Sequence, residues 1–126
     1  MEELNWLDNR GKHNAASGAD VLVTVSKKHG NGTGKLYLTF YHEAEKRVSD
    51  TGYITIAIRG SRIYMKSTTV SSGWTLSDSG SKGKSKLAQI TIPEKDYFFI
   101  QDRAGSYILF KDPSLNLYYV DLQEKR

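Results

Sequence analysis

The segment YITIAIRGSRIYMKS, residues 53–67, constrains the fold of this chain more than any other. Apolar and polar side chains alternate on both sides of Gly60 and Ser61, and a period of two is typical of a strand with one buried face. Glycine at the first of two loop positions favours a type II′ turn. The segment therefore predicts an antiparallel hairpin with strands at 53–59 and 62–68.

The predicted hairpin places two like charges opposite each other. With Gly60 and Ser61 as the loop, Arg59 pairs with Arg62. The alternation then gives the hairpin a core face made of Ile54, Ile56, Ile58, Ile63 and Met65. The opposite face presents Tyr53, Arg59, Arg62, Tyr64 and Lys66. Opposed like charges weaken a hairpin by about a few tenths of a kcal/mol, and an anion bound between the guanidinium groups would offset that cost.

Apolar runs between glycine- and proline-containing turns indicate further strands. They are predicted at 20–26, 35–40, 86–93, 97–102, 106–111 and 115–122. Phe40, Ala44 and Val48 repeat every four residues, which predicts one short helix at 41–49. Thr39 would be its N-cap, Gly52 would mark its end, and its solvated face would carry Glu43, Glu45, Lys46 and Arg47. We therefore expect a mainly β protein, an antiparallel barrel or sandwich of about seven or eight strands.

A second hairpin is predicted at 97–111, around a loop of Arg103, Ala104 and Gly105. Its register would bring together on one face Phe98, Ile100, Ile108 and Phe110. A lysine-led strand precedes each hairpin, which suggests two related units at 35–66 and 86–111. Duplication and the convergence of two ordinary hairpins explain this likeness about equally well.

The chain has 126 residues, which suits one β-rich domain, predicted at 20–122. Residues 1–19 are expected to form a loosely ordered arm, and 123–126 a charged tail. The absence of cysteine excludes disulfides and thiol chemistry. The first residues lack the basic and apolar regions of a secretory signal, and no apolar run approaches the length of a membrane span. We therefore expect a cytoplasmic protein that does not contact a membrane.

The first unit resembles the swapped-hairpin domain of AbrB/MazE-type transcription regulators and antitoxins. The matching segments are GKLYLTF, HEAEKRV, GYITIAI and GSRIYMK, all within residues 34–66. The chain departs from the family pattern at Phe40, where the family has a strand-ending proline, and at Tyr53, where it has an acidic residue. The resemblance implies an intertwined β-barrel, usually dimeric, that contacts DNA through basic residues; here two units could form a pseudo-dimer within one chain.

No segment has the residue spacing that known catalytic or metal-binding motifs require. The segments GNGTGK, residues 30–35, and GSKGKS, residues 80–85, lack the glycine spacing of a phosphate-binding loop. His13, His29 and His42 are scattered, and the acidic residues lie at turns and strand ends. An acid–base pair formed only by folding stays open. We expect a protein that is not an enzyme, with no catalytic residue, metal site or cofactor.

The net charge of +4 favours an anionic partner, and part of it lies in two glycine-rich connectors. The basic residues of these connectors are Lys27, Lys28, Lys35, Lys82, Lys84 and Lys86. Their simplest role is to keep solvated loops soluble.

Three interpretations of the polar hairpin face compete. In the first, Arg59 and Arg62 splay into solvent, which screens their charges. In the second, Arg59, Arg62 and Lys66 contact nucleic-acid phosphates, Tyr64 or Tyr53 packs against sugar or base, and the lysine connectors extend the track. In the third, the mixture of tyrosine and arginine binds an acidic protein, as small phage or mobile-element proteins do when they inhibit a host or defence protein. We predict a non-catalytic binding module, with DNA or other nucleic acid ahead of a protein target and with homo-oligomers allowed.

Overall fold

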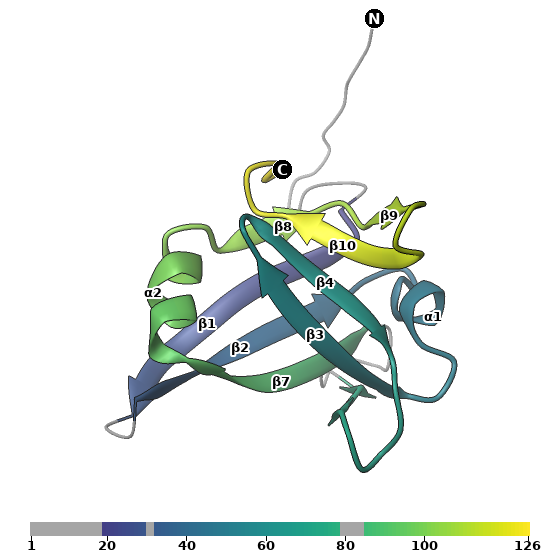
Figure 1. Cartoon of the computed structure of the whole chain (residues 1–126), viewed down its shortest axis with the longest axis horizontal. Helices are drawn as coiled ribbons and strands as arrows, with labels where there is room; N and C mark the ends of the chain where they lie inside the picture. Colours follow the sequence, from purple (N-terminus) through teal and green to yellow (C-terminus); the bar gives the residue numbers. More distant parts are fainter. Residues whose placement is uncertain (1–18, 30–31, 79–84) are drawn as a thin grey trace, which may run out of the picture.

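Two antiparallel β-sheets, packed face to face, form a sandwich in the computed structural model, which describes residues 19–29, 32–78 and 85–126 (Figure 1). The first sheet has the order β6-β7-β2-β1-β8, with β1 at Val21–His29, β2 at Thr33–Phe40, β6 at Ser77–Asp78, β7 at Lys86–Pro93 and β8 at Gly105–Tyr107. The second has the order β5-β3-β4-β10-β9, with β3 at Tyr53–Arg59, β4 at Arg62–Ser67, β5 at Trp74–Thr75, β9 at Phe110–Asp112 and β10 at Leu117–Asp121. Two helices complete the described chain: α1 at Glu45–Val48 and α2 at Glu94–Gln101. The predicted N-terminal arm lies outside the described residues, apart from Ala19.

The predicted fold class is confirmed: the structure is mainly β, and its two sheets form a sandwich that does not close into a barrel. The described residues contain ten strands instead of seven or eight. Two short strands, β5 and β6, were not predicted, the predicted strand at 106–111 is split into β8 and β9, and the one at 97–102 is replaced by a helix. The short strands β5 and β6 carry the chain from the second sheet to the first, since β5 pairs with β3 and β6 pairs with β7.

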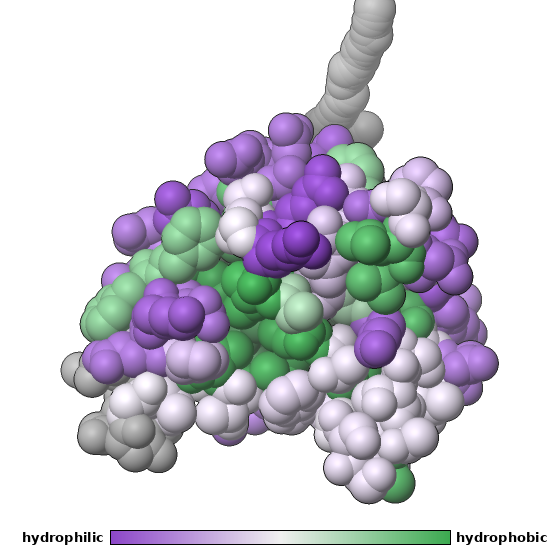
Figure 2. Space-filling model, viewed as in Figure 1, coloured by the Kyte–Doolittle hydropathy of each residue, from purple (hydrophilic) through white to green (hydrophobic). Residues whose placement is uncertain are grey.

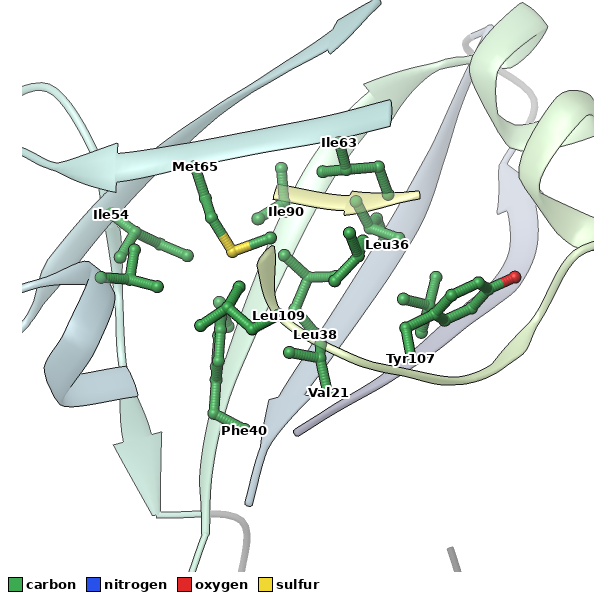
Figure 3. Close-up of a cluster of buried hydrophobic side chains, with 14 of the residues drawn as sticks. Val21, Leu36, Leu38, Phe40, Ile54, Ile63, Met65, Ile90, Tyr107 and Leu109 are labelled. Carbon is green, nitrogen blue, oxygen red and sulfur yellow. The ribbon is translucent and has the colours of Figure 1, made fainter. Parts of the chain in front are cut away.

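The core lies between the sheets, and Figure 3 shows side chains from both of them pointing toward one another. On β2, Leu36, Leu38 and Phe40 alternate onto the inner face and are fully buried. Opposite them lie Ile63 and Met65 of β4, also buried. Burial of each such side chain contributes about 1.5–3 kcal/mol, so this alternation is a main reason for the sheet pairing.

The hairpin at 53–67 is confirmed in its register, with Arg59 opposite Arg62 and Ala57 opposite Tyr64. Gly60 has a φ of 61° while Ser61 is not among the residues with positive φ, which is the pattern of the predicted type II′ turn. The predicted core face is confirmed at Ile54, Ile63 and Met65, which are buried. Ile56 and Ile58 also face inward but are only half-buried.

The first helix is shorter than predicted. It spans four residues, its N-cap is Ala44, and the expected cap Thr39 lies within β2. Phe40, Ala44 and Val48 are buried as the four-residue spacing predicted. Glu45 was expected on the solvated face, and this was wrong: its side chain is buried beside Ser49, and its Oε1 has no hydrogen-bond partner among the described residues.

The predicted strand at 97–102 is wrong, because residues 97–101 belong to helix α2 and Asp102 is its C-cap. Pro93 precedes the helix and Glu94 and Asp96 lie in its first turn, where acidic side chains stabilise a helix. Tyr97 packs closely on β2, because Gly34 leaves space that a Cβ atom there would fill at 2.8 Å from Tyr97 Cδ1.

The second predicted hairpin is therefore also wrong, and the two units 35–66 and 86–111 differ in structure. Its second strand is divided between the sheets, because β8 pairs with β1 and β9 pairs with β10. Phe98, Ile100, Ile108 and Phe110 share no face: Ile100 is buried, whereas Phe98 and Phe110 are exposed. Asp20 fixes the crossing between β8 and β9, since its carboxylate accepts a hydrogen bond from the Leu109 amide at 2.8 Å and another from Arg47.

Candidate binding face on the second sheet

The outer face of the second sheet carries the polar side of the predicted hairpin. We define this outer face by side chains of four adjacent strands: Thr55, Ala57 and Arg59 of β3, Arg62, Tyr64 and Lys66 of β4, Leu117, Tyr119 and Asp121 of β10, and Phe110 and Asp112 of β9. The pairing registers align them in rows. Arg59, Arg62 and Asp121 form one row, and Ala57, Tyr64, Tyr119 and Phe110 form the next.

Arg62 is engaged by acidic residues of the same sheet. Its guanidinium lies 3.5 Å from a carboxylate oxygen of Asp112 and 3.8 Å from one of Asp121. The same group donates a hydrogen bond of 3.0 Å to the Tyr64 hydroxyl and stacks 4.1 Å above the Tyr119 ring. The repulsion expected between Arg59 and Arg62 is therefore offset within the chain, without a bound anion.

The two carboxylates are themselves held by neighbouring groups. Asp112 accepts hydrogen bonds from the Ser114 hydroxyl and from the amides of Ser114 and Leu115. The hydrogen bond from the Ser114 hydroxyl has the largest effect and lowers the pKa of Asp112. The two amide hydrogen bonds and the positive charge of Arg62 lower this pKa further, while desolvation opposes them. Asp121 accepts from the Ser61 hydroxyl at 3.0 Å, which ties the hairpin loop to β10.

Three aromatic rings run across the outer face, from β4 to β9. Ring centroids lie 5.5 Å apart for Tyr64 and Tyr119 and 5.6 Å apart for Tyr119 and Phe110, within the range of favourable aromatic pairs. We call Tyr64, Tyr119 and Phe110 the aromatic row. Tyr64 was predicted to be exposed, and this was wrong: it is 8% exposed, whereas Phe110 is 38% exposed.

The remaining predicted residues of the hairpin face differ in their surroundings. Arg59 and Lys66 are exposed, and neither forms an ion pair within the described residues. Tyr53 is half-buried at the start of β3, opposite Thr75. Between Tyr64 and Lys66 lies a hollow of about 150 Å³, whose walls include Thr55, Ala57 and Leu117. Lys66 therefore stands at the rim of a small, partly apolar depression.

The structure does not gather the connector lysines on this face. Lys35 lies on β2 in the other sheet and donates a hydrogen bond to Thr91. Lys86, on β7, contacts Asp78 at 2.6 Å, and this hydrogen bond raises the pKa of Lys86. Side chains of Lys27 and Lys28, and all of Lys82 and Lys84, lie outside the described residues.

A second hollow, of about 450 Å³, is lined by residues around α1 and the start of β7. Buried Glu45 and paired Lys86 both contribute to it. Among residues 19–29, 32–78 and 85–126, no group of three or more histidine or acidic side chains is placed to hold a metal ion. Neither helix of the described chain is long and apolar enough to cross a membrane.

Comparison with models of protein families, with curated proteins and with solved structures found no match. The resemblance to AbrB/MazE-type domains stays a prediction. Sequence reasoning found Arg59, Arg62, Tyr64 and Lys66 but missed the neighbours that determine their chemistry, namely Tyr119, Asp121, Asp112 and Phe110. The strand at 115–122 was recognised, but no local signal indicates that it pairs with β4.

Proposed function

We propose that this protein is a non-catalytic binding module that recognises another protein through the outer face of the second sheet. The observation that carries the proposal is the engagement of Arg62 by Asp112 and Asp121 beside the aromatic row. A nucleic-acid surface needs cations that are available to phosphates. Here acidic side chains lie within the same face, which therefore has mixed charge.

The composition of the outer face favours a protein partner. Tyrosine, phenylalanine and arginine are enriched at the centres of protein interfaces, and rigid aromatic side chains lose little entropy on binding. Tyr119 and Arg62 are held in place by their stacking, so they are preorganised for a partner. The hollow beside Lys66 accepts one apolar side chain, and the exposed Lys66 ammonium would pair with an acidic residue at its rim.

The test is affinity purification from nuclease-treated lysate of cells in which the protein occurs naturally. We expect a stoichiometric protein complex that survives nuclease and is lost in Phe110→Ser and in Lys66→Glu. Lys95→Glu is the matched control, because Lys95 is also exposed but lies on α2, away from this face. Capture that disappears with nuclease, or that is unchanged in Phe110→Ser and Lys66→Glu, would refute the proposal and favour the nucleic-acid or solvent interpretation.

A further inference from the structure

The sandwich is open along the side where β3 and β7 face each other. β3 pairs with β5 only through Tyr53 and Ile54, and β7 pairs with β6 only through Lys86 and Leu87. Beyond these short strands, no described strand pairs with residues 55–59 of β3 or 88–93 of β7 on this side. Two strand edges therefore border one groove.

The edge of β3 presents backbone groups that can accept another strand. The Tyr53 carbonyl accepts a hydrogen bond from the Thr68 amide, so the backbone groups of Tyr53, and of every second residue after it, point toward β4. Ile56 and Ile58 have the opposite phase, and their N–H and C=O groups point toward the groove. Such unpaired edges are templates for strand addition.

The groove is lined by both apolar and polar residues. It has a volume of about 180 Å³. Its apolar lining consists of Ile56, Ile58, Trp74, Ile90, Ile92 and Pro93, and Thr91 and Asp96 contribute polar groups. Ile56 and Ile58 are only half-buried because nothing in the described chain covers them here. Figure 2 shows hydrophobic residues gathered in this region, between β3 and α2. Side chains entering the groove would bury this apolar surface.

A positively charged residue, Arg59, lies at the end of the β3 edge that borders the groove. Arg59 is the last residue of β3, is exposed and has no ion pair within the described residues. Its side chain points to the outer face, so a residue paired with it on an added strand would also point outward. Charge complementarity therefore favours an acidic residue at that position, next to an apolar residue facing Ile58.

We infer that the edge of β3 binds an extended peptide segment of a partner protein, which adds to the second sheet as an antiparallel strand. Antiparallel addition matches all the other strand pairs of the sheet. The bound segment has an acidic residue opposite Arg59, an apolar residue opposite Ile58, any small residue opposite Ala57 and a second apolar residue opposite Ile56. Its backbone forms hydrogen bonds with the N–H and C=O groups of Ile56 and Ile58, and its two apolar side chains fill the groove.

A second copy of this chain fits the groove less well than a peptide does. The β3 edge lies beside β7 and the residues leading into α2, which form the other wall of the groove. Two copies joined through β3 would bring these walls against each other. A single extended segment meets no such obstacle, and this mode of recognition gives affinity through the backbone and specificity through alternate side chains.

The probe is a short capped peptide in which a glutamate precedes two valines separated by one threonine. We expect titration into ¹⁵N-labelled protein to slow the hydrogen exchange of the Ile56 and Ile58 amides by at least roughly tenfold. Methylating both valine nitrogens should weaken binding by about tenfold or more, because these amides face β3. The control peptide is methylated on the glutamate and threonine nitrogens, which face away, and it should bind as the parent peptide does.

A charge swap tests the register. Arg59→Glu should weaken the peptide by roughly fivefold to tenfold, and lysine in place of the peptide's glutamate should restore binding. Lys111→Glu makes the same charge change on β9, at the opposite edge of the sheet, and should leave binding unchanged. Equal binding of the two methylated peptides, or unchanged exchange of Ile56 and Ile58, would overturn the inference. So would slow exchange of these amides in the peptide-free protein, because the edge would then already be covered by its own chain or a second copy.

This inference goes beyond the proposed function, because the peptide would bind through the backbone edge of β3 and the groove, and it shares Arg59 but not Lys66 or the aromatic row with the outer face. The two can fail separately. Loss of lysate capture in Lys66→Glu concerns only the outer face, whereas the methylated peptides concern only the edge.

Discussion

Replacement of Gly34 by alanine tests how α2 is held against the first sheet. A Cβ atom at position 34 would lie 2.8 Å from Tyr97 Cδ1 and 2.9 Å from Tyr97 Cβ. Carbon atoms pack at about 3.5–4.0 Å, so the shortfall is about 0.7 Å. The contact to Tyr97 Cβ matters most, because rotating the ring does not relieve it. The backbone of α2 must move.

The cost follows from two opposing effects. Overpacking that forces a backbone shift typically costs about 1–3 kcal/mol. Alanine also restricts the unfolded chain relative to glycine, which returns about 0.4–1 kcal/mol because no positive φ is required at this position. We therefore expect Gly34→Ala to lower the free energy of unfolding by about 1–2 kcal/mol. For a chain of this length, that lowers the Tm by about 3–10 °C.

The assay is urea unfolding of Gly34→Ala, Tyr97→Gly and the double variant, because only glycine at position 97 removes the Cβ atom as well as the ring. If the clash with Tyr97 is the cause, Gly34→Ala costs stability in the parent but is neutral or stabilising in the Tyr97→Gly background. Equal costs in both backgrounds, or a Gly34→Ala protein as stable as the parent, would refute this account of how α2 packs.

Three other changes have defined outcomes. Burial raises the pKa of Tyr107, whose hydroxyl donates a hydrogen bond to the Arg103 carbonyl. The stability that this residue contributes is therefore full below about pH 10 and is lost as the pH rises through the raised pKa. Tyr107→Phe should remove this alkaline dependence and cost about 1–2 kcal/mol at neutral pH, measured by denaturant titration. The pKa of Asp112 lies below its ordinary value of 3.8, so its contribution to folding stability is present above that pH and is lost as the pH falls through the lowered pKa. Ser114→Ala should reduce this sensitivity to acid. Identical acid-unfolding curves for the parent and Ser114→Ala would count against it. Glu45→Met removes a buried carboxylate oxygen that has no hydrogen-bond donor in the part of the chain that the structure describes. The change should be neutral or stabilising by about 1 kcal/mol, whereas clear destabilisation in calorimetry would mean that Glu45 has a partner.

The elements with strong local signals were predictable from the sequence. Strands β2, β3, β4 and β7 follow from period-two alternation and from the turns that bound them, which are properties of neighbouring residues. Helix α2 was not predicted, because YFFIQD has the aromatic and β-branched content of a strand. Its helix signals, Pro93 followed by Glu94 and Asp96, were present but outweighed. Packing of Tyr97 on Gly34 is a tertiary effect that no local pattern reveals.

The candidate site was predicted in part for the same reason. The register that places Arg59 opposite Arg62 follows from a two-residue loop, so it could be read from the sequence. The partners of Arg62 could not, because Asp112 and Asp121 are distant in sequence and reach it through the strand order β4-β10-β9. The chemistry of the arginine pair therefore depends on sheet topology, because the strand order determines whether acidic side chains of the same sheet lie within reach of Arg62.

Arg62 is engaged by Asp112 and Asp121, so we expect the hairpin face to bind nucleic acid only weakly. A nucleic-acid titration at low salt tests this expectation. Labelled single- and double-stranded DNA and RNA are titrated with the parent and with Arg59→Ala/Arg62→Ala at about 50 mM and 200 mM salt, with folding checked by circular dichroism. We expect weak binding that is the same in both proteins. Tight binding at the lower salt that falls steeply at the higher, and that is lost in the double variant, would contradict it.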